Sequence, residues 1–327
     1  MIGRRRAFRL AGAMAVLAIV VWRLGTGPFR DGLSAVDGRA LAAAAGIGVV
    51  TTVCCAWRWT VVAQGLGVPL SLRDAVAAYY RSLFLNLTLP GGVVGDVHRG
   101  VSHGRDADDV GRGLRAVAWE RAAGQVVQAV LTVLVLLALP SPVRSSMPLV
   151  AAALAGAMIG VVLMGRLRSK GGRSRWERFR GAVAGDLRDA VLQWRALPAV
   201  VLASAVVVAG HAATFLIAAR TAGATAPPSR MLPLALLAML AMVLPSVAGW
   251  GPREGATAWA FGAAGLGADL GVETAVVYGV MSLVASLPGA LVLAGGALPR
   301  ARPRRRPEAP LPRRVPVPVR REGVRRG

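Results

Sequence analysis

Two apolar segments that are interrupted by proline and glycine carry the residue types most suited to chemistry. The first covers residues 86–99 (NLTLPGGVVGDVHR) and the second covers residues 244–254 (LPSVAGWGPRE). Proline ends a helix and glycine permits backbone geometries closed to other residues, so we expect backbone N–H groups to be left without helical partners there. Such N–H groups beside an arginine suit an anionic group such as a phosphate.

The first segment ends with an acid and an arginine that one helical turn would bring together. Asp96 and Arg99 are three residues apart, the spacing of neighbours on a helix surface. We interpret Arg99 as a phosphate contact and Asp96 as the group that orients it; the alternative is an ion pair that only caps a helix. The candidate binding residues of this segment are Asn86, Pro90, Gly92, Gly95, Asp96 and Arg99.

The second segment places an arginine and an acid directly after its glycines. Gly251 and Pro252 precede the pair Arg253 and Glu254. Because the planar guanidinium of arginine matches phosphate, we include Gly251, Arg253 and Glu254 among the candidate binding residues. The alternative is an ordinary helix start, where the helix dipole favours an acid such as Glu254 in the first turn.

A polar stripe on a third apolar segment is the next candidate. Arg121, Gln125, Gln128 and Thr132 fall on one face of a helix, and Glu120 precedes Arg121. In a membrane helix such groups face the bundle interior or a water-filled cavity. We include Glu120, Arg121 and Gln125 as candidate binding residues; the alternative is hydrogen bonding between helices.

Other polar residues give weaker signals. We interpret His211 as a structural histidine, and the row Tyr278, Ser282 and Ser286 as helix packing.

Catalytic and metal-binding patterns are weak or missing from the sequence. His98 and His103 have no third ligand at metal-site spacing, so we predict no metal and no cofactor. Cys54 and Cys55 are adjacent in an apolar run, which favours buried thiols over a disulfide. We see no nucleotide-binding loop and no nucleophile motif, and we therefore do not expect an enzyme.

The elements that must position these residues are membrane helices. Of the 327 residues, 55% are hydrophobic. Several apolar runs approach or exceed the ~20 residues that span a bilayer. We predict an all-α, polytopic transmembrane bundle of about 6–8 spans with one or two re-entrant or broken helices. The helical runs cover residues 8–24, 40–62, 74–90, 115–139, 147–165, 197–220, 231–248, 255–268 and 273–298.

The distribution of charge predicts the topology. The net charge is +23, and most of it lies in residues 4–9, 166–195 and 300–327. Because an excess of Lys and Arg marks the cytoplasmic side, we expect both termini to be cytoplasmic. An even number of crossings must then separate successive basic segments, which holds if the run 74–90 enters and returns. Four crossings, or two plus a re-entrant pair, both satisfy this condition for the second half.

These patterns divide the chain into a membrane domain and a tail. We predict a transmembrane domain over 1–298, with halves at 8–165 and 197–298 that are joined by the basic cytoplasmic loop 166–196 and are candidates for a pseudo-repeat. The Arg- and Pro-rich tail 299–327 is expected to be disordered and to bind the anionic inner leaflet rather than nucleic acid.

Near the inner end of the run 40–62, Trp57-Arg58-Trp59 has the composition of an interfacial anchor. We expect the two tryptophans to lie at the membrane surface and Arg58 to extend its guanidinium toward the headgroups.

Taken together, the motifs resemble the lysylphosphatidylglycerol synthase transmembrane-region family. The resemblance rests on N-x-x-x-P-G-G-x-x-G-D-x-x-R from Asn86 to Arg99, on Glu120-Arg121, on P-x-x-x-G-x-G-x-R-E-G from Pro245, and on Trp57-Arg58-Trp59, and it covers about residues 10–298. One departure is that His98 and Gly100 flank Arg99 where bulkier apolar residues are usual.

The resemblance implies an integral plasma-membrane protein without the soluble aminoacyl-transfer domain of its multidomain relatives. In those relatives this region is associated with moving aminoacylated phospholipid between leaflets, and other relatives suggest polyprenyl-linked sugars as cargo. By matching position, the implied functional residues are Asn86, Pro90, Gly92, Gly95, Asp96, Arg99, Glu120, Arg121, Gly251, Arg253 and Glu254.

Three functional hypotheses follow. The leading one is a translocator (flippase) of a phospholipid or lipid-linked headgroup, with an anionic phospholipid or a polyprenyl-linked headgroup as its partner. The second is a membrane transferase or accessory subunit in lipid or cell-envelope glycolipid metabolism. The third is a non-catalytic membrane scaffold, with an unidentified protein partner.

Deletion of residues 300–327 separates the first and third hypotheses. A translocator should keep its activity without the tail, whereas a scaffold that recruits lipid or protein through the tail should lose its function. The measurement is movement of a labelled anionic or polyprenyl phospholipid by reconstituted protein. Loss of movement in the deletion variant would contradict the translocator hypothesis.

Overall fold

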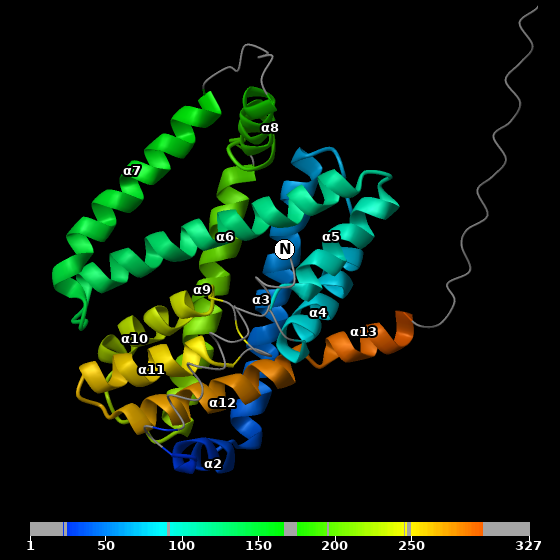
Figure 1. The fold of residues 1–327 in the computed structure, drawn as a ribbon. Coiled ribbons are helices and arrows are strands. Elements are labelled where there is room, and N and C mark those ends of the chain that lie inside the picture. Colours follow the sequence, from blue (N-terminus) through cyan, green and yellow to red (C-terminus); the bar gives the residue numbers. More distant parts are fainter. Residues whose placement is uncertain are drawn as a thin grey trace, which may run out of the picture.

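The chain folds into a bundle of helices of very different lengths (Figure 1). The computed structural model describes residues 22, 25–89, 92–166, 175–194, 196–244, 246 and 250–296. Within that part, five helices are long and apolar enough to cross a membrane: Gly38–Gly65, Val110–Ala138, Arg144–Val161, Ala196–Thr221 and Ala268–Ala294. The predicted all-α polytopic membrane bundle is therefore confirmed. The expected span at 8–24 and the tail 299–327 lie outside the described residues.

The order of long and short helices repeats in the two halves. In the first half, the long α3 (Gly38–Gly65) is followed by the short α4 (Leu72–Thr88) and α5 (Val94–Asp106) and by the long α6 (Val110–Ala138). In the second half, the long α9 (Ala196–Thr221) is followed by the short α10 (Pro228–Ala241) and α11 (Pro252–Ala263) and by the long α12 (Ala268–Ser286). Each proline–glycine interruption lies between the two short helices of its half.

The remaining helices lie around this repeated core. They are α2 (Gly27–Ser34), the 3₁₀ turn η1 (Arg144–Ser146), α7 (Met147–Arg166), α8 (Arg175–Ala190) and α13 (Pro288–Gly296).

The second half holds fewer spans than its four apolar runs suggested. α10 has 14 residues and α11 has 12, both short of the ~20 residues that cross a bilayer. The two helices pack against each other, as α4 and α5 do in the first half. These lengths favour the alternative of two crossings plus a broken pair.

Side-chain caps fix the starts of α4, where the first segment begins, and of α6, which carries Glu120 and Arg121. Ser71 accepts a hydrogen bond from the backbone N–H of Asp74 at the start of α4. Asp109 accepts one from the N–H of Arg112 at the start of α6. Such caps satisfy N–H groups that have no partner within the helix, so the loops before α4 and α6 end at defined residues.

Small residues allow the long helices to pack closely. α3 lies along α9, and α12 crosses both (Figure 1). A side chain at Gly48 would press on Ala285 of α12, and one at Gly210 would press on Thr51 of α3. Since lipid gives no hydrophobic drive for association, close van der Waals contact through small residues holds such helices together.

Glycines also bring α5 and α6 together. An added Cβ at Gly113 would lie 2.5 Å from the backbone of both Gly100 and Gly104. The two helices therefore touch backbone to backbone at this crossing. The contact places Arg99 of α5 beside Glu120 of α6, two turns further along that helix.

Replacement of Gly113 by alanine should destabilise the bundle. The new methyl group would overlap backbone atoms that cannot move aside as a side chain can, and overpacking of this kind costs about 1–3 kcal/mol. The matched control is Gly156→Ala in α7, where an added Cβ meets nothing within 4 Å. The thermal midpoint of purified protein in detergent should fall for Gly113→Ala alone, and equal midpoints would contradict the crossing.

Candidate functional site

The first broken element is held together by one asparagine across the interruption. The Asn86 side-chain oxygen accepts a hydrogen bond from the Gly95 N–H at 2.7 Å, and its Nδ2 donates to Asp96 at 3.1 Å. Gly92 has a φ of +65°, a conformation that favours glycine. Any side chain at Gly95 would overlap the backbone of Ser82. Asn86, Gly92 and Gly95 thus shape this turn, and Pro90 lies outside the described residues.

Asp96 joins this turn to two arginines. Its carboxylate accepts hydrogen bonds from Ser82 at 3.1 Å, from Arg99 Nε at 3.0 Å and from Arg121 Nη2 at 2.8 Å. Burial raises the pKa of the Asp96 carboxyl, but Arg121 and Arg99 outweigh burial and hold that pKa below its ordinary value. Asp96 is therefore an anion that both arginines share.

Glu120 is a fully enclosed charge of the site. It is 0% exposed and accepts hydrogen bonds from Arg58 Nε at 3.0 Å, Arg99 Nη2 at 2.6 Å and the Tyr79 hydroxyl at 3.1 Å. Arg58 also donates to Ser204 at 2.8 Å. One carboxylate thus ties together α3, α4, α5 and α6, and Arg58 extends the chain of contacts to α9.

The expectation that Arg58 extends toward the membrane surface is wrong. Its residue is 5% exposed, and the guanidinium points inward to Glu120. Gly124 provides the space for the Arg58 guanidinium, since a Cβ at position 124 would lie 2.7 Å from Arg58 Nη1. Trp59 is also fully buried, whereas Trp57 keeps 37% of its surface. The pairing with a buried carboxylate outweighs the interfacial preference of arginine.

Arg99 is enclosed rather than presented to a ligand at the interruption. It is 0% exposed and its guanidinium carbon lies 4.7 Å and 4.3 Å from the ring centres of Trp59 and Tyr79. Its Nη1 has no hydrogen-bond partner among the described residues. Arg99 forms part of the wall of a cavity of about 420 Å³. The same wall includes Ser102 and His103 of α5, and residues between Pro69 and Arg81 in and before α4.

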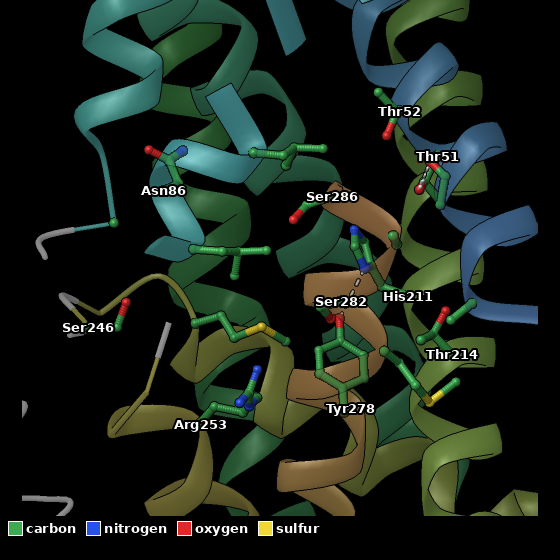
Figure 2. Close-up of a pocket in the computed structure, with 18 of the residues that line it drawn as sticks. Thr51, Thr52, Asn86, His211, Thr214, Ser246, Arg253, Tyr278, Ser282 and Ser286 are labelled. Atoms are coloured by element: carbon green, nitrogen blue, oxygen red, sulfur yellow. Dashed lines mark hydrogen bonds between the residues drawn. The ribbon is translucent and has the colours of Figure 1, made fainter. Parts of the chain in front are cut away.

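The two interrupted segments meet at a different cavity, of about 270 Å³. It receives Asn86 and Gly92 from the first interruption and Ser246 and Arg253 from the second (Figure 2). Arg121 of the third candidate segment also lines it, and its side chain is 39% exposed. Polar side chains from α3, α9 and α12 complete the wall: Thr51, Thr52, His211, Thr214, Tyr278, Ser282 and Ser286.

The second interruption positions one arginine. Gly251 has a φ of +114°, and its N–H donates to Glu254 at 2.6 Å at the start of α11. Glu254 also accepts a hydrogen bond from Arg253 Nε at 3.0 Å. The Arg253 guanidinium lies 5.6 Å and 5.5 Å from the ring centres of Trp250 and Tyr278. Glu254 is therefore both a helix cap and the group that orients Arg253.

Several residues of the cavity wall were interpreted from the sequence as structural or packing residues only. His211 Nδ1 and the Tyr278 hydroxyl form a hydrogen bond of 3.0 Å, and both residues line the cavity with Ser282 and Ser286 (Figure 2). In contrast, Gln125 is not among the residues that line it. Of the predicted polar stripe, only Arg121 reaches the wall.

A family comparison agrees with these motifs. The family model described as Lysylphosphatidylglycerol synthase TM region matches residues 7–289. The chain belongs to this family. No curated protein and no solved structure matches the chain.

For a member of the lysylphosphatidylglycerol synthase TM region family, the structure divides the motif residues into two groups. Asp96, Arg99, Glu120 and Glu254 hold other charges in place behind the wall of the smaller cavity. Arg121, whose side chain is 39% exposed, and Arg253, whose side chain is 4% exposed, line that wall. Guanidinium groups backed by fixed carboxylates can bind an anionic ligand without rearrangement of the helices.

Three residues that the motifs did not reveal, Tyr79, Ser82 and Ser204, complete the network together with Arg58, which the sequence had assigned to the membrane surface. Gly124 was the available signal for Arg58, because a glycine one turn after Glu120 leaves space for a large partner.

Loss of the Glu120 charge should destabilise the protein strongly. Glu120→Gln leaves Arg58 and Arg99 without their shared anion, and removal of one partner of a buried pair costs about 3–5 kcal/mol. The control is Asp109→Asn, which removes an exposed pair with Arg112 and keeps a capping side chain. Exposed pairs contribute about 0–1 kcal/mol. Thermal midpoints in detergent measure both, and similar values would contradict the assignment.

Proposed function

We propose that this protein moves a phospholipid or a lipid-linked headgroup between the two leaflets of the plasma membrane, with both termini in the cytoplasm. The observation that carries the proposal is a pair of cavities with charged and polar side chains in their walls, at different levels along α3 and α4, with the buried ion network between them. Broken helices that meet at an internal polar site are typical of membrane transporters.

The depths of the cavities follow from the helices that line them. Along α3, the smaller cavity is lined by residues 44–52 and the larger one by Trp59. Along the opposed α4, the larger cavity is lined by residues 71–81 and the smaller one by residues 83–87. The network residues Arg58, Tyr79 and Ser82 lie at the level where one cavity gives way to the other.

Polar cavities lower the cost of moving a headgroup through the membrane. A charge in the hydrocarbon core is expensive, so a headgroup needs fixed polar partners along its path. Irregular backbone at this depth is tolerated where it lines such a cavity, which accounts for both interruptions.

Arg121 can exchange partners without leaving a buried charge unpaired. In the structure it donates to Asp96, which also holds Arg99, Ser82 and Asn86. If a phosphate takes Arg121, Asp96 therefore keeps three hydrogen-bond donors. The exchange avoids the large penalty of an uncompensated buried ion.

The network also has a charge that favours an anionic cargo. Its chain of hydrogen bonds runs Arg58–Glu120–Arg99–Asp96–Arg121. Three arginines and two carboxylates leave one positive charge in excess, and a phosphodiester supplies one negative charge. Binding of a lipid phosphate therefore neutralises the chain.

Substitution of either wall arginine should slow lipid movement. Arg121→Ala and Arg253→Ala each remove a charge-assisted hydrogen bond, worth about 1.5–3 kcal/mol, and should lower the rate about 10- to 100-fold. Arg112→Ala, which removes an exposed arginine outside both cavity walls, is the control. The assay follows a labelled anionic or polyprenyl phospholipid in proteoliposomes. Equal rates in the unsubstituted protein and both variants would overturn the proposal.

A further inference from the structure

We propose that the cavity where the two interruptions meet selects a phosphodiester headgroup that carries neighbouring hydroxyl groups and no amine. A glycerol or sugar phosphate headgroup has this chemistry. The inference rests on the proposed function and narrows the class of lipid. Three properties of the cavity wall lead to it: the sign of its charges, the direction of its hydrogen bonds, and its size.

The charges at the wall are of one sign. Arg121 and Arg253 line the cavity, and none of the described lining residues is an Asp or a Glu. The carboxylates of Asp96 and Glu254 are engaged behind these arginines. An ammonium group in the cavity would meet two guanidinium groups and no carboxylate, so an aminoacylated headgroup is disfavoured.

Three hydroxyl groups of the wall are oriented as acceptors. Thr51, Thr214 and Ser286 each donate their hydroxyl hydrogen to a backbone oxygen three or four residues earlier, at 3.2, 3.0 and 2.7 Å. A hydroxyl that has used its hydrogen still offers lone pairs on its oxygen. A ligand that satisfies these oxygens must carry donors of its own.

Donors and acceptors of the wall therefore match two parts of one headgroup. The guanidinium groups donate, which suits the oxygens of a phosphate. The threonine and serine oxygens accept, which suits the O–H groups of a polyol. Figure 2 shows Arg253 on one side of the cavity and Thr51 and Thr214 on the other, so one ligand has to present both kinds of group.

The volume fits a headgroup rather than a whole lipid. The cavity of about 270 Å³ is near the lower end of the range of small-molecule sites. Apolar side chains line another part of the wall, including Leu83, Leu87, Met242 and Leu244. The acyl or prenyl chain would leave along these side chains.

Four labelled lipids in proteoliposomes of the full chain test the selectivity. Phosphatidylglycerol and phosphatidylpropanol have the same charge, but only the first has free hydroxyls. Phosphatidylcholine and lysylphosphatidylglycerol add a cationic group. We expect phosphatidylglycerol to move about tenfold faster than phosphatidylpropanol, as for one or two lost hydrogen bonds, and faster than both cationic headgroups. Equal rates for phosphatidylglycerol and phosphatidylpropanol, or a preference for lysylphosphatidylglycerol, would overturn the inference.

A hydroxyl deletion identifies the groups responsible. Thr214→Val keeps the shape of the side chain and removes its oxygen, so the ratio of the phosphatidylglycerol rate to the phosphatidylpropanol rate should fall severalfold. Thr88→Val is the control, because Thr88 makes the same bond to a backbone oxygen, at 2.7 Å, but does not line the cavity. An unchanged preference in Thr214→Val would contradict the role of the wall hydroxyls.

A binding measurement separates the inference from the proposed function. Short-chain phosphatidylglycerol should raise the thermal midpoint of the detergent-solubilised protein more than short-chain phosphatidylcholine does. Selective binding without transport of any lipid would support the inference and overturn the translocator. Transport without selectivity would support the translocator and overturn the inference about the headgroup. If free glycerol phosphate stabilises as well as the lipid, the ligand is a soluble phosphate ester and the lipid assignment fails.

Discussion

A carboxylate buried between two arginines is the constraint on which the rest of the bundle depends. Moving an ion out of water costs several kcal/mol even after relaxation, so Glu120 is tolerated only while Arg58 and Arg99 stay in place. Those partners come from α3 and α5, and Tyr79 of α4 adds a third donor. The helices cannot shift independently without breaking these contacts. The glycine crossing of α5 on α6 and the space beside Gly124 are the packing solutions that this pairing requires.

The network is fixed at one end and adjustable at the other. Around Glu120 every partner is enclosed, and Arg99 lies between two aromatic rings. Around Asp96 the partners include Arg121, whose side chain is 39% exposed at a cavity wall. An incoming anion can therefore reach Arg121 without disturbing Glu120. The contacts of Glu120 hold the helices together, and Arg121 remains available to contact an anion.

Local sequence patterns predicted the long apolar helices and the two interruptions, and four of the predicted residues, Asn86, Gly92, Arg121 and Arg253, line the cavity where the interruptions meet. Apolar length, proline and glycine are local properties, and Asn86 to Arg99 forms its turn mainly from its own residues. The pairing of Arg58 with Glu120 could not be predicted in this way, because it joins positions 62 residues apart and depends on how α3 and α6 cross. The tryptophans beside Arg58 pointed to the interface instead. His211 and Tyr278, also far apart in sequence, became partners only through the packing of α9 on α12.

The excess positive charge of the ion network favours open cavities beside the network over a closed path. Three arginines and two carboxylates leave one positive charge that no member of the hydrogen-bonded chain compensates. A sealed, empty path would bury that charge in hydrocarbon, which is costly. In the proposed transport, water in the cavity at Arg121 would stabilise the charge while no lipid is bound, and a phosphodiester would replace that water. The second cavity lies on the other side of the network, where Arg99 forms part of its wall. The excess charge therefore favours a path that keeps an open cavity beside Arg121 over a path that is sealed.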